Sequence, residues 1–450
     1  MRRTSISRTS DEQPYDQDTM TIDLPTPTRL DRFVCNEDGR LTQVISFDEV
    51  SYRSSVSHAP DGDDLTGGWW HAYLEGRGPE AAMAGKTLRT AELFSGPGGL
   101  ALGFSQASAE LGHRWRSMAA VDTDPEALAV YRRRNGTRYT STDSAAMLVD
   151  YRVSGQGTGA RFQYEPEIVD EGWLREVGEV DVLLAGPPCQ GHSNLNNRTR
   201  RTDRRNELYL TVPAVAQAVR AEVVVIENVR AVIHDRKQVV QTAEALLRGA
   251  GYEIEQGVIK AVDLGWPQRR ERYFIVARRS RSPISFEEVV AAIGDQPRDI
   301  MWAIGDLDSS NEDSYMTRAP VLSDENQRRI DWLFDNDEYD LALSERPDCH
   351  KDGTTYDAVY GRLHPDRPAP TITTGFMTPG RGRYIHPYER RVITAREAAR
   401  LQGFPDDYDF QPRPGAEPSK AKLTKWIGDA VPMPLGYAAT MAALAPGWNN

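Results

Sequence analysis

The sequence predicts an α/β protein in which a mainly parallel, Rossmann-like sheet carries helices on both faces and a smaller, loop-rich domain is attached. Two observations lead to this prediction. Between about residues 87 and 282, short and nearly continuous apolar runs alternate with helical patterns, as expected for strands buried on both faces. Several of the apolar runs end in Gly-rich or polar turns, which is where open α/β sheets bind their ligands.

The strands are expected where a short apolar run ends in polar or Gly residues, at 87–95, 114–122, 180–186, 221–229 and 269–277. Helices are expected between them, at 124–135, 208–219 and 238–251. A helical pattern returns at 394–404, and a final apolar stretch covers 424–445. The main domain is therefore expected at 86–282, completed by residues 390–450.

The alternation of strand and helix patterns is lost on either side of the main domain. Residues 1–85 are rich in Ser, Thr, Asp and Gly, and their strong apolar cluster lies at Trp69–Leu74. We expect a mostly flexible arm with one short segment that docks on the core. Residues 283–389 are first acidic and then rich in Gly, Pro and Thr, which predicts a separate loop-rich domain.

The composition excludes several classes of protein. A chain of 450 residues with 39% hydrophobic residues can bury a sizeable core, and no apolar run is long enough to span a membrane. Its three cysteines form neither a disulfide framework nor a paired-Cys zinc motif, so a reducing compartment and no bound metal are expected.

The net charge of −12 argues against nucleic acid as a partner until its distribution is considered. Acidic residues outnumber basic ones in 1–64 and in 301–349. Elsewhere, 198–205 (RTRRTDRR) and 261–281 form basic patches of the kind that contact phosphates. A solvated loop is the alternative interpretation of each Arg run.

A Gly-rich turn follows the first strand, in AELFSGPGGLALGF (91–104). Glycines let the backbone approach a ligand and expose amides at the start of a helix. The segment does not fit the dinucleotide template GxGxxG, because Ala101 stands where the third Gly is needed. Asp122 ends the next strand, where a carboxylate accepts hydrogen bonds from ribose hydroxyls. A purely structural turn remains the alternative.

Two further strand ends carry reactive groups. Cys189 follows Pro187 and Pro188 after a buried strand, and a thiolate there would be a nucleophile. Glu227 ends the otherwise apolar run VVVIENV, where partial burial raises a carboxyl pKa and suits it to donate a proton. Taken singly, an inert core Cys and a helix-capping Glu are the alternatives.

Arginines precede the last strand of the main domain, in GWPQRRERYFIVA (265–277). Arg270 and Arg272 share a face at a period of two residues. Together they are placed to clamp a phosphate or an acidic side chain.

Six segments, taken in order, resemble the signature blocks of the DNA (cytosine-5)-methyltransferase family. They are Phe94–Gly99, Gly186–Gln190, Glu227–Val229, Gln268–Arg272, Arg396–Pro405 and Gly428–Pro432, and the resemblance covers roughly residues 87–447. It implies an S-adenosylmethionine-dependent methyltransferase domain, with 283–389 as a target-recognition domain that reads base edges in the major groove.

The resemblance implies S-adenosyl-L-methionine as the cofactor. Asp122 would hold its ribose and Asp143 would lie beside its adenine. The pocket would be completed by Phe94, Gly96, Gly99, Thr123, Pro188 and Asp429. Asp429 departs from the usual Asn of the family, which changes the expected contact with the methionine ammonium group. Glu92 stands where Asp is commoner.

The resemblance also implies the catalytic residues. The Cys189 thiolate would add to C6 of a cytosine flipped out of the duplex, and Glu227 would hold N3 and the exocyclic amine. Arg272, supported by Arg270, would position the base and a nearby phosphate.

Double-stranded DNA is the partner that the resemblance implies. In the loop after the nucleophile, the expected contacts are Gln190, Ser193, Arg198, Arg200, Arg201, Arg204 and Arg205. In the target-recognition domain they lie at about 350–385 and include Arg381 and Arg383, each with a structural loop residue as the alternative. His192 replaces the usual Phe of the nucleophile block.

These features predict a bacterial, cytoplasmic enzyme that methylates cytosine C5 in a specific DNA sequence, beside a cognate restriction or defence nuclease. Two alternatives stay open. One branch of the family methylates transfer RNA, and a catalytically silent DNA-binding homologue would keep the fold. The silent homologue is disfavoured because Cys189, Glu227 and Arg272 are all present.

Overall fold

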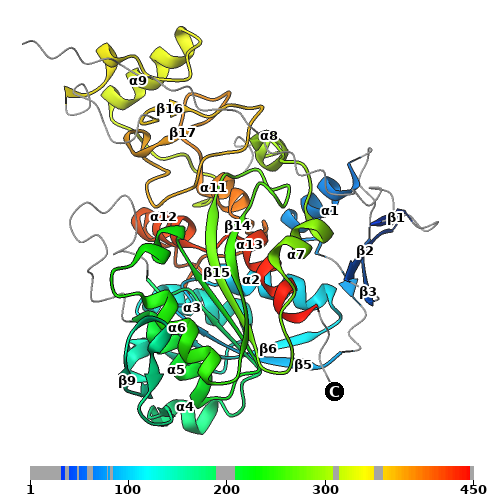
Figure 1. Cartoon of the computed structure of the whole chain (residues 1–450). Coiled ribbons are helices and arrows are strands. Elements are labelled where there is room, and N and C mark those ends of the chain that lie inside the picture. The colour runs from blue at the N-terminus through cyan, green and yellow to red at the C-terminus, as the bar shows by residue number, and fades with distance from the viewer. Residues whose placement is uncertain are drawn as a thin grey trace, which may run out of the picture.

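The structure is a computed structural model that describes residues 32–35, 40–47, 50–57, 64–78, 80–81, 85–188, 208–307, 314–348 and 358–445. A large body is built around one central sheet, and a smaller lobe containing α9 (Asp324–Asp335), β16 (Gly361–Arg362) and β17 (Arg383–Ile385) lies beyond one end of it (Figure 1).

The central sheet has seven strands in the order β14-β15-β13-β12-β5-β6-β7. The strands β5, β6, β7, β12 and β13 are parallel, whereas β15 runs antiparallel to both of its neighbours. Five strands confirm the predicted segments: β5 (Thr87–Leu93), β6 (Arg114–Val121), β12 (Val182–Ala185), β13 (Val223–Asn228) and β15 (Glu271–Arg278). The α/β fold class is therefore confirmed. Two strands, β7 (Tyr139–Ser141) and β14 (Glu253–Lys260), were not predicted.

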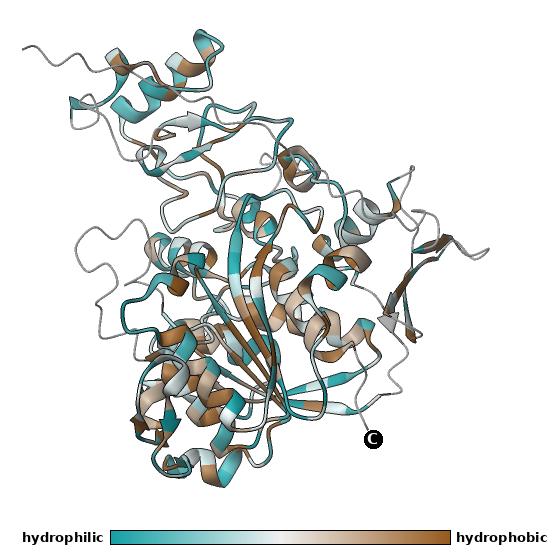
Figure 2. Cartoon of the chain, in the orientation of Figure 1, coloured by the Kyte–Doolittle hydropathy of each residue, from teal (hydrophilic) through white to brown (hydrophobic). Residues whose placement is uncertain are grey.

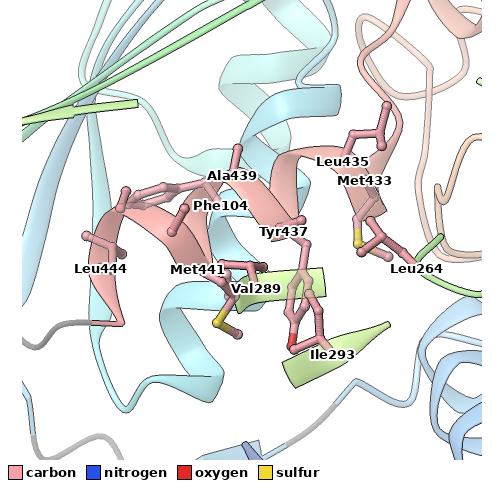
Figure 3. Packing of buried hydrophobic residues seen from close by; sticks show 14 of the residues in the cluster. Phe104, Leu264, Val289, Ile293, Met433, Leu435, Tyr437, Ala439, Met441 and Leu444 are labelled. Carbon is pink, nitrogen blue, oxygen red and sulfur yellow. The ribbon is translucent and has the colours of Figure 1, made fainter. Parts of the chain in front are cut away.

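Helices cover both faces of the sheet. One face packs against α2 (Gly99–Glu110) and α13 (Met433–Leu444), through the cluster partly drawn in Figure 3. The other packs against α5 (Thr211–Ala218) and α6 (Val239–Gly249). Because both faces are covered, the strand centres are hydrophobic without alternation, as Figure 2 shows.

The predicted final helix is two helices, α12 (Lys420–Asp429) and α13, separated at Ala430–Pro432. Helices α2 and α13 touch backbone to backbone, because a Cβ built on Gly103 would lie 2.4 Å from the amide nitrogen of Tyr437. The helices α3 (Pro125–Asn135) and α11 (Ala395–Leu401) lie where the sequence predicts them.

A small subdomain occupies residues 145–177, between β7 and β12. It consists of two short hairpin-like pairs and one helix, namely β8 (Val149–Asp150), β9 (Val153–Ser154), β10 (Arg161–Phe162), β11 (Glu167–Ile168) and α4 (Glu171–Glu176). It lies at the end of the sheet opposite the small lobe (Figure 1).

The boundary of the small lobe differs from the predicted 283–389. The helix α7 (Phe286–Ile293) packs into the core of the large body through Phe286, Val289 and Ile293, and α8 (Ile300–Ile304) contacts α11. A separate core is formed by Ile330, Leu333, Leu341, Val359, Tyr360, Ile385 and Val392. The lobe with its own core therefore begins after α8.

The prediction of a mostly flexible arm does not fit the described residues between 32 and 81. They form an antiparallel sheet of β1 (Phe33–Cys35), β2 (Leu41–Phe47), β3 (Val50–Val56) and β4 (Glu80–Ala81), followed in sequence after β3 by α1 (Leu65–Leu74). The predicted docking segment is buried: Trp69 is 0% exposed, and the Trp70 ring lies 5.1 Å from that of Tyr437. None of the described helices is long and apolar enough to cross a membrane.

Candidate active site

Three of the sequence blocks meet at one edge of the central sheet. The strands β5, β12 and β13 are parallel neighbours, so their carboxyl ends lie side by side. A Cβ built on Gly186, just after β12, would lie 3.7 Å from Glu227 Oε2 and 3.9 Å from the Phe94 carbonyl oxygen. These are ordinary contact distances, and they show that the first three blocks lie beside one another.

Glu227 and Arg272 form an ion pair at the centre of this edge. The distance between Arg272 Nε and Glu227 Oε1 is 2.9 Å, and only 11% of the Glu227 side chain is exposed. Burial raises the pKa of Glu227, while the charges of Arg272 and Arg270 oppose the rise. A carboxyl whose pKa is raised is suited to donate a proton or hydrogen bond.

The chain around Glu227 is held by its neighbour. The Asn228 side chain donates to the Pro187 carbonyl oxygen at 3.1 Å, which ties the end of β13 to the Pro187–Pro188 turn. Pro188, expected at the cofactor pocket, is partly exposed and immediately precedes Cys189. Cys189 itself lies outside the described residues.

A second group of polar contacts surrounds the Gly-rich turn after β5. The Gly96 amide donates to Asp122 Oδ2 at 2.7 Å, and the Asp124 amide donates to Asp122 Oδ1 at 2.8 Å. Burial raises the pKa of Asp122, and these two donors oppose the rise. Phe94, Gly96 and Gly98 all have positive φ, and this conformation folds the turn over the strand end.

The turn leads into α2 without a capping side chain. Gly98 is the N-cap residue, and no side chain accepts a hydrogen bond from the first turn of the helix. Gly99 is fixed by packing, since a Cβ there would lie 2.6 Å from the Val431 carbonyl oxygen. The predicted cofactor residues Phe94, Gly96, Gly99 and Asp122 are therefore brought together.

The other predicted cofactor residues lie around the same turn. The Asp122 amide donates to the Ser141 carbonyl oxygen at 3.2 Å, which places the end of β7, and Asp143 after it, beside β6. Thr123 and Asp143 are exposed. Asp429 ends α12 and pairs with Lys425 at 3.0 Å.

Lys425 is a residue of this site that the sequence did not indicate. The charges of Asp429, Asp122 and Asp124 raise the pKa of Lys425 against the opposing effect of burial. Trp426 beside it donates to Asp124 at 2.8 Å. The sequence contains only a weak indication of Lys425. The segment TKWIGD shows a helical pattern, but it does not show which strand end the helix faces.

The structure gives Arg270 a different role from the predicted clamp. Its guanidinium is buried and donates to the carbonyl oxygens of Ile372 at 2.7 Å, Gly428 at 3.1 Å and Ala430 at 3.0 Å. Arg272 alone contacts Glu227. Arg270 therefore ties three chain segments together behind the site.

Arg383 was predicted to contact DNA, but its guanidinium instead contacts other residues of the protein. It donates to the carbonyl oxygens of Tyr339 at 3.0 Å and Arg362 at 2.8 Å, and it pairs with Asp340. These contacts hold the small lobe together and leave little of the guanidinium for a phosphate. Arg381 is exposed. The remaining predicted DNA contacts lie outside the described residues: Gln190, Ser193, Arg198, Arg200, Arg201, Arg204 and Arg205.

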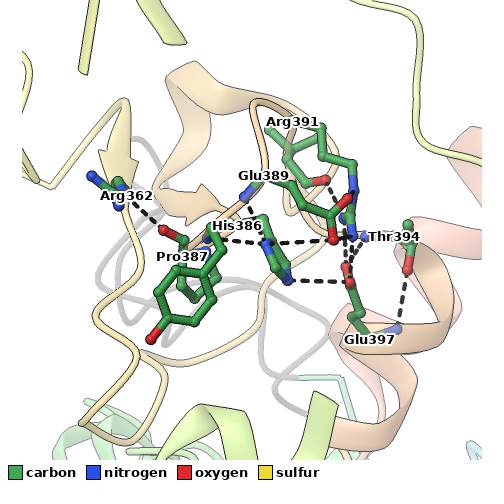
Figure 4. Close-up of polar contacts among 9 residues, drawn as sticks. Arg362, His386, Pro387, Glu389, Arg391, Thr394 and Glu397 are labelled. Carbon is green, nitrogen blue, oxygen red and sulfur yellow. Dashed lines mark hydrogen bonds and ion pairs between the residues drawn. The ribbon is translucent and has the colours of Figure 1, made fainter. Parts of the chain in front are cut away.

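A buried polar cluster joins the small lobe to α11 (Figure 4). Arg391 donates to both oxygens of Glu397, at 2.7 and 2.8 Å, and to both of Glu389, at 2.8 and 2.9 Å. His386 Nδ1 accepts from the amides of Tyr388 and Glu389, so the imidazole is neutral, and burial lowers its pKa. His386, Glu389 and Glu397 are close enough together to bind a metal ion, but Arg391 already supplies both carboxylates with positive charge. The absence of a metal stays a prediction.

Glu92 leads to the first testable prediction. Burial raises its pKa to about 8, and the Asp122 charge adds to the rise while Tyr131 opposes it. A carboxyl whose pKa is higher in the folded state stabilises the protein fully below its ordinary pKa of about 4.5, and that contribution is lost as the pH rises to about 8. Glutamine does not ionise, so we expect the stability of Glu92→Gln not to fall over this pH range. At pH 8 the variant should unfold at a higher denaturant concentration than the wild type.

The measurement is the free energy of unfolding from urea titrations at pH 5 and pH 8. The matched control is Glu253→Gln, which changes an exposed glutamate on β14. An equal pH dependence of wild type and Glu92→Gln would show that Glu92 is already ionised in the folded protein.

Fold and site together define an α/β protein whose candidate site lies at the carboxyl edge of a mainly parallel sheet. A family model for C-5 cytosine-specific DNA methylases matches residues 88–443, and the chain belongs to that family. It is therefore a DNA (cytosine-5)-methyltransferase by family.

Individual relatives agree with this assignment. The chain is 38% identical to the Type II methyltransferase M1.BsuMI of Bacillus subtilis, over 81% of this chain and 82% of the relative. It is 28% identical to the Type II methylase M.HgiDII of Herpetosiphon aurantiacus, over 77% of this chain and 92% of that one. The crystal structure of S. pombe Dnmt2 methyltransferase has the same fold, with a TM-score of 0.52, 18% identity, and coverage of 80% of this chain and 99% of that chain.

Proposed function

We propose that this protein methylates C5 of a flipped cytosine in a specific sequence of double-stranded DNA through a covalent bond between Cys189 and cytosine C6. The observation that carries the proposal is the buried Glu227–Arg272 pair at the strand end next to the Pro187–Pro188 turn. Cys189 is the next residue in the sequence after this turn. Activation of the cytosine ring requires a carboxyl that can act on N3 and a thiolate that can add to C6.

The proposed chemistry begins with the thiolate. Cytosine C5 is a poor nucleophile, and addition of the Cys189 sulfur to C6 converts the ring into an enamine. Glu227 donates a proton or hydrogen bond to N3, where negative charge develops during the addition. Arg272 holds Glu227 in place and faces the flipped base. Loss of the C5 proton after methylation breaks the bond to sulfur and regenerates the thiolate.

The residues of the Gly-rich turn fit S-adenosylmethionine as the cofactor. Asp122 is a half-buried carboxylate next to a turn with positive φ, and the first turn of α2 has no capping side chain. Asp122 and Asp143 are suited to the ribose and adenine, and Asp429 and Lys425 to the amino-acid end. When bound, the cofactor supplies an electrophilic methyl group.

The experiment that tests the function is transfer of labelled methyl from S-adenosylmethionine to duplex DNA and, in parallel, to transfer RNA. Mass spectrometry of the nucleosides identifies the product. We expect 5-methylcytosine in DNA, and the methylated positions give the target sequence. Label in transfer RNA alone would favour the RNA-modifying branch of the family, and no label in either would favour a silent homologue.

The names of the curated relatives support a place in a restriction–modification system. We propose a cognate nuclease that cleaves the same sequence when it is unmethylated. Methylated DNA from the transfer assay should then resist that nuclease, and cleavage equal to that of untreated DNA would contradict the pairing.

A further inference from the structure

A groove with basic walls lies beside the active site, at the edge strand of the central sheet. Its volume is about 430 Å³, and its walls include Lys260, Arg269, Arg270, Glu271, Pro297 and Pro368. Lys260 is the last residue of β14, and Glu271 is the first residue of β15. The groove thus lies at the same end of the sheet as Glu227.

The backbone around the groove is held on both sides. On one side, the Ala261 amide donates to the Arg270 carbonyl oxygen at 2.9 Å. On the other, the Arg269 amide donates to Ala369 at 2.8 Å, and the Ala369 amide donates to Pro267 at 2.9 Å. Lys260 and Arg269 therefore project from a fixed backbone and not from a long loop.

These two cations are exposed and lack acidic partners. In the described chain, no carboxylate lies within ion-pair distance of Lys260 or Arg269. The one acidic residue of the groove, Glu271, faces Arg230 at 3.4 Å. Many other arginines of the protein, among them Arg383, Arg391 and Arg400, are ion-paired. The groove consequently carries uncompensated positive charge in an otherwise acidic protein.

We propose that Lys260 and Arg269 bind the phosphodiester backbone of the substrate DNA, as a phosphate-binding surface separate from the pocket that holds the cytosine. This inference rests on the proposed function, and it specifies where the flanking DNA runs: over the β14 edge of the sheet.

The spacing fits a DNA strand. Arg269 precedes Arg272 by three residues, about 10 Å of extended chain, and nucleotides of one strand rise about 3.4 Å each along the duplex. With Arg272 next to the flipped base, Arg269 would reach a phosphate about three nucleotides away. Lys260 lies across from Glu271, next to Arg272, and would reach a nearer phosphate. Contacts of this kind position the duplex and are independent of sequence.

The test is the salt dependence of DNA binding by Lys260→Gln, Arg269→Gln and the double variant. Fluorescence anisotropy with a labelled duplex gives log Kd against log salt. Each lost phosphate contact lowers the slope by about 0.9, so the double variant should lose about 1.8. The matched control is Arg175→Gln, an exposed arginine on α4 at the opposite end of the sheet, which should keep the wild-type slope.

Binding of S-adenosylhomocysteine to each variant checks that the fold is intact. A double variant with the wild-type slope would overturn the inference, and so would an equal loss of slope in Arg175→Gln. If the wild type methylates DNA and the double variant keeps the wild-type salt dependence, only this inference is contradicted and the proposed function is not. A wild-type protein that binds no DNA would contradict the proposed function itself.

Discussion

Replacing Glu227 by Gln is expected to lower kcat for DNA methylation by about 10²- to 10³-fold. The amide has nearly the shape of the carboxyl, so the pocket is preserved, but it cannot transfer a proton to N3 of the base. Burial raises the pKa of Glu227, while the charges of Arg272 and Arg270 oppose the rise. Because the effect lies in the chemical step, KM for DNA should change much less than kcat.

The measurement is steady-state methyl transfer at several DNA concentrations. Glu253→Gln provides the control, since it makes the same change at an exposed position far along β14. An unaltered kcat in Glu227→Gln would contradict the catalytic role of Glu227. A fall in S-adenosylhomocysteine binding of the same size would assign the loss to the fold of the site.

Replacing Arg270 by Gln is expected to lower the free energy of unfolding by at least about 3 kcal/mol, since each buried group that loses its partner costs about 1–3 kcal/mol. The guanidinium donates to three carbonyl oxygens, of Ile372, Gly428 and Ala430. A glutamine side chain is shorter and cannot reach all three. The segment around Ile372, between β16 and β17, and the end of α12 would then separate from the start of β15.

Urea-induced unfolding followed by tryptophan fluorescence measures this loss. Arg269→Gln makes the same change at the adjacent, exposed position and should leave the free energy of unfolding within about 0.5 kcal/mol of the wild type. Equal stability of Arg270→Gln and Arg269→Gln would show that Arg270 is not the structural tie that its hydrogen bonds indicate.

The sequence predicted the central sheet because its strands are apolar on both faces. Val223–Ile226 has no polar residue in its centre, and each of these four residues is 0% exposed. The edge strand β14 was missed, since EIEQGVIK is largely half-buried and carries no apolar run. The N-terminal sheet was missed as well, although Leu41, Ile45 and Phe47 show the two-residue period of its strand β2. The Ser- and Thr-rich surroundings concealed that pattern.

The groups of the candidate active site could be predicted because parallel strands bring their ends together. Phe94, Gly186 and Glu227 each follow or end such a strand, and the structure places them side by side. Contacts that depend on distant segments could not be predicted in this way. Arg270 and Arg272 look equivalent in sequence, yet one donates to carbonyl oxygens more than 100 residues away and the other to Glu227. The two arginines differ only because α12 and the segment around Ile372 pack against Arg270.

The central claim, a covalent bond between Cys189 and cytosine C6, is tested most directly by trapping. In duplex DNA that contains 5-fluorocytosine, the ring cannot release fluorine as it releases the C5 proton, so the adduct persists after methyl transfer. We expect a stable protein–DNA adduct that depends on S-adenosylmethionine, with the modified nucleotide on the peptide that carries Cys189, and no adduct from Cys189→Ser. An adduct on Cys35 or Cys349, or DNA methylation that persists in Cys189→Ser, would contradict the account.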